Sequence, residues 1–382
     1  MNRSQTQFLE LLKAGLWGNT VNPDNFKPES TNWKAIARMA YEQVVMVVVS
    51  DAIETLPKEC YPPEDIILRF AMSRTKTLQM HKLLNATIRQ IIEAFEEQGV
   101  CSVLLKGQGL AQCYLNPMSR ACGDIDLYTG FGGYKKAVEI IDSLNQGKQI
   151  REATECVHHM HTCLNDVDVE IHRQASFIHG RRMDSNFQNW TKDSLDQFFG
   201  TGQFETWDND GTAVALPTPT FNAFYILHHS IRHMTTEAMV LRQVCDWMML
   251  LHKYHSQLDV ELLKRKLKEM HMMTVWEEFS RLAVNFLGFP KEELPIPMTS
   301  LEPTPVTYKL LKHILIPGNF ATLTSKERSL SNMPYLKRKW RGFTYQANRL
   351  LQLFKLFPDY AATYMWHWST GALVRFILQR DK

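Results

Sequence analysis

Apolar residues recur at helical spacing through the first part of the chain. The clearest case lies in residues 73–98, where they follow one another at intervals of three and four positions and Gly99 supplies a stop signal. These apolar positions are Leu84, Ile88, Ile91 and Phe95. A valine-rich run at 44–49 favours a strand by composition, but the residues before it keep helical spacing, so we expect a buried helix there. The pattern predicts a helical region over residues 1–98.

The pattern changes after Gly99. A short apolar run at 100–105 predicts a strand, and a turn follows at Lys106 and Gly107. Residues 108–115 then have the spacing of a helix, which the following Asn-Pro pair would end. The order strand, turn, helix is typical of an α/β unit.

A second strand is predicted over residues 124–128, where the sequence reads DIDLY. A glycine-rich segment at 130–133 predicts a loop, and residues 134–144 have the apolar spacing of a further helix. Together with the preceding strand and helix, these elements predict a small α/β core over residues 99–216.

Residues 158–172 have the pattern of a β-hairpin. Two strands, at 158–164 and 167–172, are separated by the turn residues Asn165 and Asp166. In the second strand, apolar residues alternate with Asp168, Glu170 and His172. Because side chains alternate between the two faces of a strand, one face is expected to be apolar and the other ionisable.

Helical periodicity returns beyond Pro217 and Pro219, for example at Leu241, Val244 and Met248. We therefore expect a C-terminal helical domain over residues 217–382. The whole chain is predicted to be α+β and mostly α-helical, with a short mixed sheet in the central region and helical regions on either side of it.

Composition places the chain among soluble globular proteins, since 45% of its 382 residues are hydrophobic and 22% are charged. A net charge of +3 is too small for a surface-wide nucleic-acid footprint. Seven cysteines without paired spacing indicate reduced thiols. No apolar run approaches the roughly 20 residues that span a bilayer, and the aromatic stretch at 364–378 is read as core packing rather than a membrane contact. We expect a cytoplasmic protein.

The turn at Lys106 and Gly107 is a candidate phosphate site. A strand that ends in a small-residue turn before a helix presents free backbone N–H groups, and here the helix would begin at Gln108. Lys106 would add a positive charge beside them. A lysine-glycine pair also occurs in ordinary turns, so this signal depends on what surrounds it.

Asp124 and Asp126 are the most informative pair of residues. Strand periodicity places both carboxylates on one face with Ile125 behind them, and aspartate is disfavoured in strands. Such a pair calls for a compensating cation such as Mg²⁺. A solvated edge strand is the alternative. A third acid from the hairpin, Glu170 or Asp168, would complete a two-metal arrangement.

Several other polar residues are candidates for lesser roles. Arg120, four positions before Asp124, could offset phosphate charge, and His172 could orient Glu170 or touch a nucleotide. Arg242 and Asp246 are four apart on a predicted helix, so they either form a surface pair or line a cleft between domains.

The segment LLKGQGLAQCYLNPMSRACGDIDLY, together with VEIH at residues 169–172, resembles the family of uncharacterised nucleotidyltransferases within the polymerase-β-like superfamily. Weaker similarity extends to FLELLKAGLW near the N-terminus and to HHSIRH and LRQVCDW downstream. The resemblance covers most of the chain, with specific motifs only between Leu104 and His172.

This resemblance implies a minimal nucleotidyltransferase core with helical additions. It further implies two Mg²⁺ ions, or Mn²⁺ in their place, held by Asp124, Asp126 and Glu170. The reaction would transfer a nucleoside monophosphate from an NTP to a small molecule, a glycan precursor of the kind made in bacteria, or a macromolecule. Glu170 fits the family strand better than Asp168 because it lies between two apolar residues.

The turn departs from the wider superfamily, which usually has Gly-Ser where this chain has Lys106 and Gly107. A nucleotide-binding regulatory protein without turnover is therefore an alternative to an enzyme. A further alternative is modification of RNA, with the basic and aromatic segment at 337–345 as the contact, although the net charge does not favour it.

Overall fold

The computed structural model describes residues 1–145, 154–155, 159–178, 180–199, 201, 204–236, 239–316 and 335–363. It is mostly helical and contains a five-stranded sheet of order β1-β2-β5-β4-β3 and a separate two-stranded sheet, β6-β7. The predicted α+β class, mostly α-helical with a short mixed sheet, is confirmed. Among the described helices, none combines the length and apolarity needed to cross a membrane.

Four helices form the N-terminal region: α1 (Arg3–Trp17), α2 (Trp33–Glu42), α3 (Met46–Ile53) and α4 (Glu64–Glu97). The helix expected over 73–98 is present, but it begins earlier because Pro63 and two acidic residues in the first turn favour a helix start there. Most of the valine run lies in α3 as expected, but Val44, with φ of 58°, and the N-cap residue Val45 precede the helix.

The main sheet contains β1 (Val103–Leu104), β2 (Asp124–Tyr128), β3 (Thr154–Glu155), β4 (His159–Leu164) and β5 (Val167–His172). β2 and β5 are parallel, whereas the other neighbours are antiparallel, so the sheet is mixed. The hairpin turn has φ of 54° at Asn165 and 61° at Asp166, the positive values that a tight two-residue turn requires. The predicted hairpin is therefore present.

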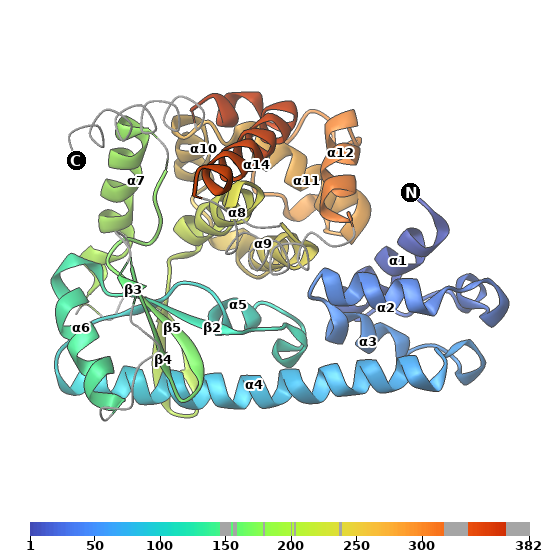
Figure 1. Ribbon diagram of the computed structural model, residues 1–382, viewed down its shortest axis with the longest axis horizontal. Helices are drawn as coiled ribbons and strands as arrows, with labels where there is room; N and C mark the ends of the chain where they lie inside the picture. Colours follow the sequence, from blue (N-terminus) through green and yellow to red (C-terminus); the bar gives the residue numbers. More distant parts are fainter. Residues whose placement is uncertain are drawn as a thin grey trace.

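The two faces of this sheet differ in chemistry. Ile125, Val169 and Ile171 lie on one face and share a buried core with α4 and with α6 (Gly130–Leu144). Figure 1 shows the C-terminal part of α4 running beside the sheet, while its N-terminal part runs beside α2 and α3. The opposite face carries the ionisable side chains of β2, β4 and β5. The glycine-rich loop expected at 130–133 is wrong, since packing places these glycines in the first turn of α6 despite their low helix propensity.

The other described elements are helical apart from the small β6-β7 hairpin. They are α5 (Gln108–Ala111), α7 (Arg181–Ser194), β6 (Glu205–Asn209), β7 (Thr212–Leu216), α8 (Pro219–Thr236), α9 (Leu241–Tyr254), α10 (Val260–Glu269), α11 (Met273–Leu287), α12 (Pro305–Ile314) and α14 (Tyr335–Leu356). Within the basic segment at 337–345, the side chains of 337–339, 342, 343 and 345 lie outside the described residues, as does the whole aromatic stretch at 364–378.

The N-terminal helices pack against the C-terminal ones. Trp17 donates its indole N–H to the carbonyl of Leu287 at 2.7 Å, and Phe8, Leu12 and Phe279 belong to one buried apolar cluster. A second cluster joins the sheet and α6 to the C-terminal part of α4 and to β7. The division into regions at residues 98 and 216 stays a prediction, and the packing shows that the two outer regions share a core.

Candidate functional site

The ionisable sheet face is built by strand register. In the parallel pair, Asp126 lies beside Glu170 and Asp124 lies beside Asp168. In the antiparallel pair, Glu170 lies beside His161. Because residues directly opposite one another project from the same face, this register gathers acids and histidines over three adjacent strands.

Three carboxylates of this face converge. One oxygen from each of Asp124, Asp126 and Glu170 lies within 4.8 Å of the others. Asp126 is fully buried, whereas the side chain of Asp124 is 45% exposed, so the group opens to solvent on one side. Asp168 is exposed and does not belong to this group, although it shares the face.

Lys106 lies between the two aspartates. Its Nζ is 3.0 Å from Oδ1 of Asp126 and 3.7 Å from Oδ2 of Asp124. Burial acts to lower the pKa of Lys106, but the charges of Asp126 and Asp124 outweigh it and raise this pKa above the ordinary lysine value. In the absence of a metal ion, the ammonium group therefore supplies the positive charge that the paired acids need.

Histidines of β4 and β5 lie close to Glu170. His161 Nε2 is 2.8 Å from one carboxylate oxygen, and His172 Nε2 is 3.2 Å from the other and 3.2 Å from Oδ1 of Asp126. Burial acts to raise the pKa of Glu170, but the hydrogen bond from His172 and the charge of Lys106 lower it to about 2. Glu170 is therefore ionised throughout the neutral range.

The donor set suits a hard divalent cation. Mg²⁺ and Mn²⁺ prefer carboxylate oxygens, and three of these meet here. Oδ2 of Asp126 is buried and has no hydrogen-bond partner among the described residues, which is costly for a charged oxygen unless a ligand satisfies it. An ion held by Asp124, Asp126 and Glu170 would supply that partner.

The turn that carries Lys106 requires glycine at the next position. Gly107 has φ of 63° and ψ of −119°, and a Cβ placed there would lie 3.1 Å from the carbonyl oxygen of Asp124. The helix after this turn, α5, has only 4 residues. The expected helix over 108–115 is thus much shorter, because the chain turns again before Asn116. A macrodipole of that length adds little to phosphate binding.

Gly107→Ala should lower the free energy of unfolding by about 1–3 kcal/mol, because alanine would be strained at this positive φ and crowded against Asp124. Gly132→Ala is the matched control. Gly132 lies in α6 with open space around its Cβ position, so alanine there should stabilise the fold by about 0.5–1 kcal/mol. Urea unfolding of both variants measures the difference, and equal effects would contradict this role of Gly107.

Two residues expected near a nucleotide are used inside the fold. The side chain of Gln108 is buried and donates to Asn85 and to the carbonyl of His81, both on α4. Arg120 is 5% exposed and binds Asp246 through two bonds, of 2.7 Å from Nε and 2.8 Å from Nη2. The phosphate role expected for Arg120 has no support in this arrangement, because its guanidinium is held by a buried carboxylate.

Arg120 and Asp246 connect the loop after α5 to α9. The hydroxyl of Tyr114 donates to Oδ1 of Asp246 at 2.7 Å, and Arg242 donates to the carbonyl of Ala121 at 2.8 Å. Asp246 is 4% exposed, so it belongs neither to an exposed helix-surface pair with Arg242 nor to the open floor of a cleft. Both residues instead fix α9 against the sheet region.

Sequence reasoning did not place two further residues near Lys106. The positive charge of Lys106 acts on Tyr225 and His229, both on α8. Burial and this charge lower the pKa of His229 well below its ordinary value, so its imidazole is neutral. The spacing of four positions, which puts both side chains on one helix face, was the only available signal.

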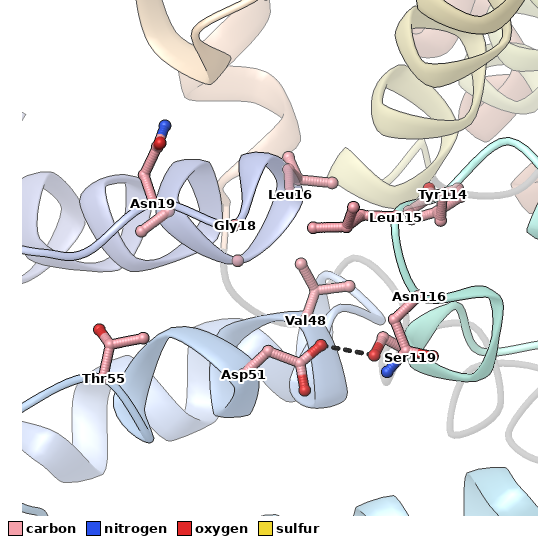
Figure 2. Close-up of a pocket in the computed structure, with 12 residues that line it drawn as sticks. Leu16, Gly18, Asn19, Val48, Asp51, Thr55, Tyr114, Leu115, Asn116 and Ser119 are labelled. Atoms are coloured by element: carbon pink, nitrogen blue, oxygen red, sulfur yellow. Dashed lines mark hydrogen bonds between the residues drawn. The ribbon is translucent and has the colours of Figure 1, made fainter.

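A separate cavity of about 180 Å³ lies between α1, α3 and the segment after α5. Figure 2 shows Asp51 of α3 facing Ser119 across it, and the Ser119 hydroxyl donates to Asp51. None of the residues lining this cavity belongs to the carboxylate group of β2 and β5. Its volume is below the roughly 300 Å³ of ordinary small-molecule sites, so the sheet face remains the better candidate.

Comparison with protein families gives one match. A family model described as "Uncharacterised nucleotidyltransferase" matches residues 29–288, which is more than half of the chain. The matched range includes the sheet, Lys106 and helices α8 and α9. No curated protein and no solved structure matches the chain.

Proposed function

The chain belongs to the family of uncharacterised nucleotidyltransferases, and from this premise we propose that it transfers a nucleoside monophosphate from an NTP to an acceptor with the help of two divalent metal ions. Asp124, Asp126 and Glu170 are proposed as the ligands of these ions. Mg²⁺ is the ion we expect, with Mn²⁺ as a substitute.

One observation carries this proposal. The three carboxylates meet within 4.8 Å, and the most buried of them has an oxygen without a hydrogen-bond partner among the residues that the structure describes. Burying acids side by side is unfavourable unless a cation compensates them. Lys106 compensates in part, but it leaves Oδ2 of Asp126 unsatisfied.

The residues of the sheet face would have distinct roles in the proposed reaction. Divalent ions bound to the carboxylates would neutralise the triphosphate and stabilise the leaving pyrophosphate. Asp126 is held by β2 inside the fold, and Glu170 is oriented by His161 and His172. Lys106 lies at the end of the preceding strand, where its ammonium group would attract phosphate oxygens of the NTP.

Lys106→Met should separate the structural charge of Lys106 from that of a metal ion. Without divalent ions, removing Lys106 leaves Asp126 buried with little compensation, so the free energy of unfolding should fall by about 3 kcal/mol. Breaking a buried ion pair usually costs about 3–5 kcal/mol, and we expect the lower value because Asp124 is partly exposed to solvent. Added Mg²⁺ should restore stability in this variant far more than in the unaltered protein, as thermal melting would show.

Equal stabilisation of Lys106→Met and of the unaltered protein by Mg²⁺ would contradict this prediction, because it would mean that Lys106 and the ion do not occupy the same position between the carboxylates. The control is Lys135→Met, since Lys135 is almost fully exposed on α6 and its ion-pair partner, Glu139, is exposed as well. Its melting temperature should not respond to Mg²⁺ differently from that of the unaltered protein.

Incubation with NTPs labelled on the α-phosphate, in the presence of Mg²⁺ and an extract of small molecules and macromolecules, tests the proposed reaction. We expect transfer of label with release of pyrophosphate, and its loss in Asp124→Ala. Unchanged transfer in Asp124→Ala would contradict the proposed site. Release of inorganic phosphate in place of pyrophosphate would contradict the reaction class.

A second candidate function is nucleotide binding without turnover. The observation that favours it is the position of Lys106, which pairs with both aspartates at the turn where the wider superfamily usually has Gly-Ser. Calorimetry that shows Mg²⁺-dependent NTP binding, together with no labelled product from any acceptor, would support this candidate over the enzyme.

A further inference from the structure

Two histidines and Glu170 converge beside the carboxylate group. Nε2 of His172 is 3.2 Å from Oε2 of Glu170, and Nε2 of His159 is 3.8 Å from the same oxygen. One ligand atom from each of the three residues lies within 4.8 Å of the others. This set of two nitrogens and one oxygen differs from the all-oxygen set of Asp124, Asp126 and Glu170.

The spacing of these atoms suits a small tetrahedral ion. Zn²⁺ binds imidazole nitrogen and carboxylate oxygen at about 2.0–2.2 Å, which places neighbouring ligand atoms of a tetrahedron about 3.4 Å apart. The separations of 3.2 Å and 3.8 Å lie on either side of that value. All three ligand atoms lie within 4.8 Å of one another, so side-chain rotations that bring the more distant atoms closer would complete the coordination.

The sheet fixes the position of all three residues. His159 and His172 are directly opposite in the antiparallel pair β4–β5, and Glu170 lies two positions before His172 on the same face of β5. His161, opposite Glu170, is 2.8 Å from Oε1 and holds the carboxylate so that Oε2 faces the two imidazoles. Hydrogen bonds of this kind orient ligands in established metal sites.

The site is reachable from solvent. The side chain of His159 is 22% exposed, whereas that of His172 is 8% exposed, so an ion would enter past His159 and rest against the buried residue. Imidazole favours d-block ions such as Zn²⁺ and Co²⁺ over Mg²⁺. The ring contact between His159 and His172, with centroids 4.9 Å apart, keeps both imidazoles at one point of the face.

We propose that His159, Glu170 and His172 form a binding site for a d-block divalent cation of the Zn²⁺ class, with Glu170 shared between this site and the carboxylate group. The fourth coordination position is open to water or to another ligand. The site goes beyond nucleotidyl transfer, because it depends only on the arrangement of these three residues. A shared Glu170 makes binding at the two sites interdependent.

Titration of the full chain with Co²⁺, in the absence of nucleotide, tests this site. The visible absorption of tetrahedral cobalt should appear and saturate at one ion per chain. His159→Ala should weaken binding by about 100-fold or more, since loss of a ligand costs at least as much as loss of a residue that orients one. His159→Gln is a second variant that keeps a polar side chain on β4, and it should show the same loss.

His255→Ala is the control, because His255 is an exposed histidine in the turn after α9 and should leave cobalt affinity unchanged. Asp124→Asn should also keep the cobalt spectrum while losing nucleotidyl transfer, so failure of this site and failure of the proposed function are distinguishable. Unaltered cobalt binding in both His159 variants would overturn the proposal. An absorption band from thiolate coordination would also overturn it, by placing the ion on cysteine.

Discussion

Asp126→Asn is expected to reduce nucleotidyl transfer by about a thousandfold, because a lost metal ligand removes several kcal/mol of transition-state stabilisation and about 4 kcal/mol corresponds to that factor. The substitution keeps the size of a side chain that is 0% exposed, so packing is preserved. Pyrophosphate release at saturating NTP measures the rate. Calorimetry should show weaker Mg²⁺ binding in the same variant.

Asp168→Asn provides the comparison for this loss. Asp168 is also a strand aspartate on the ionisable face, but it is exposed and lies outside the group of three converging carboxylates. Its substitution should change the rate by less than about tenfold, which corresponds to 1.4 kcal/mol. A larger loss in Asp168→Asn than in Glu170→Gln would contradict Glu170 as the third ligand and support Asp168 in its place.

Asp246→Ala is expected to lower the free energy of unfolding by about 3–5 kcal/mol, because it leaves Arg120 as an uncompensated buried charge. Both side chains are at most 6% exposed, and their ion pair joins the loop after α5 to α9. Tyr114 would also lose the acceptor of its hydroxyl. Denaturant unfolding at neutral pH measures the change.

The exposed pair of Lys135 and Glu139 on α6 is the control, since Glu139→Ala should cost less than about 0.5 kcal/mol. In the variant Arg120→Met combined with Asp246→Leu, much of the lost stability should return, because an apolar pair of similar volume needs no compensation. Equal losses in Asp246→Ala and Glu139→Ala would contradict the importance of the buried pair.

The same ion pair predicts a dependence on pH. Burial acts to raise the pKa of Asp246, but the charge of Arg120 and its hydrogen bonds outweigh it and lower the pKa below that of a free aspartate. The stabilisation is therefore present above the unfolded-state pKa of about 3.9 and is lost as pH falls through the folded-state pKa. Asp246→Asn should flatten this acid limb of the stability curve.

Much of the fold could be predicted because its strands and helices have clear periodicity. Alternation in DIDLY and in residues 167–172 predicts both central strands, and Asn165 with Asp166 predicts their turn. Their parallel pairing with Glu170 beside Asp126 follows from no local pattern, since it depends on how the hairpin docks against β2. The catalytic and metal-binding roles of these residues remain predictions.

Other features of the site could not be read from the sequence. A buried arginine and an exposed one look alike in a sequence, so Arg120 was expected to bind a phosphate. In the structure it binds Asp246, which is distant in the sequence. The histidines of β4 become candidate ligands only because β5 places Glu170 and His172 beside them. Tertiary contacts between distant segments decide both cases.

Anomalous diffraction from crystals grown with Mn²⁺ and a non-hydrolysable NTP tests the central claim most directly. We predict two Mn²⁺ peaks about 3.5–4 Å apart, in contact with Asp124 and Asp126 and beside the triphosphate, with Glu170 as a third ligand. Lys106 should then have moved from the aspartates toward a phosphate oxygen. An ordered triphosphate with no manganese at these carboxylates, and Lys106 still paired with Asp126, would contradict the claim.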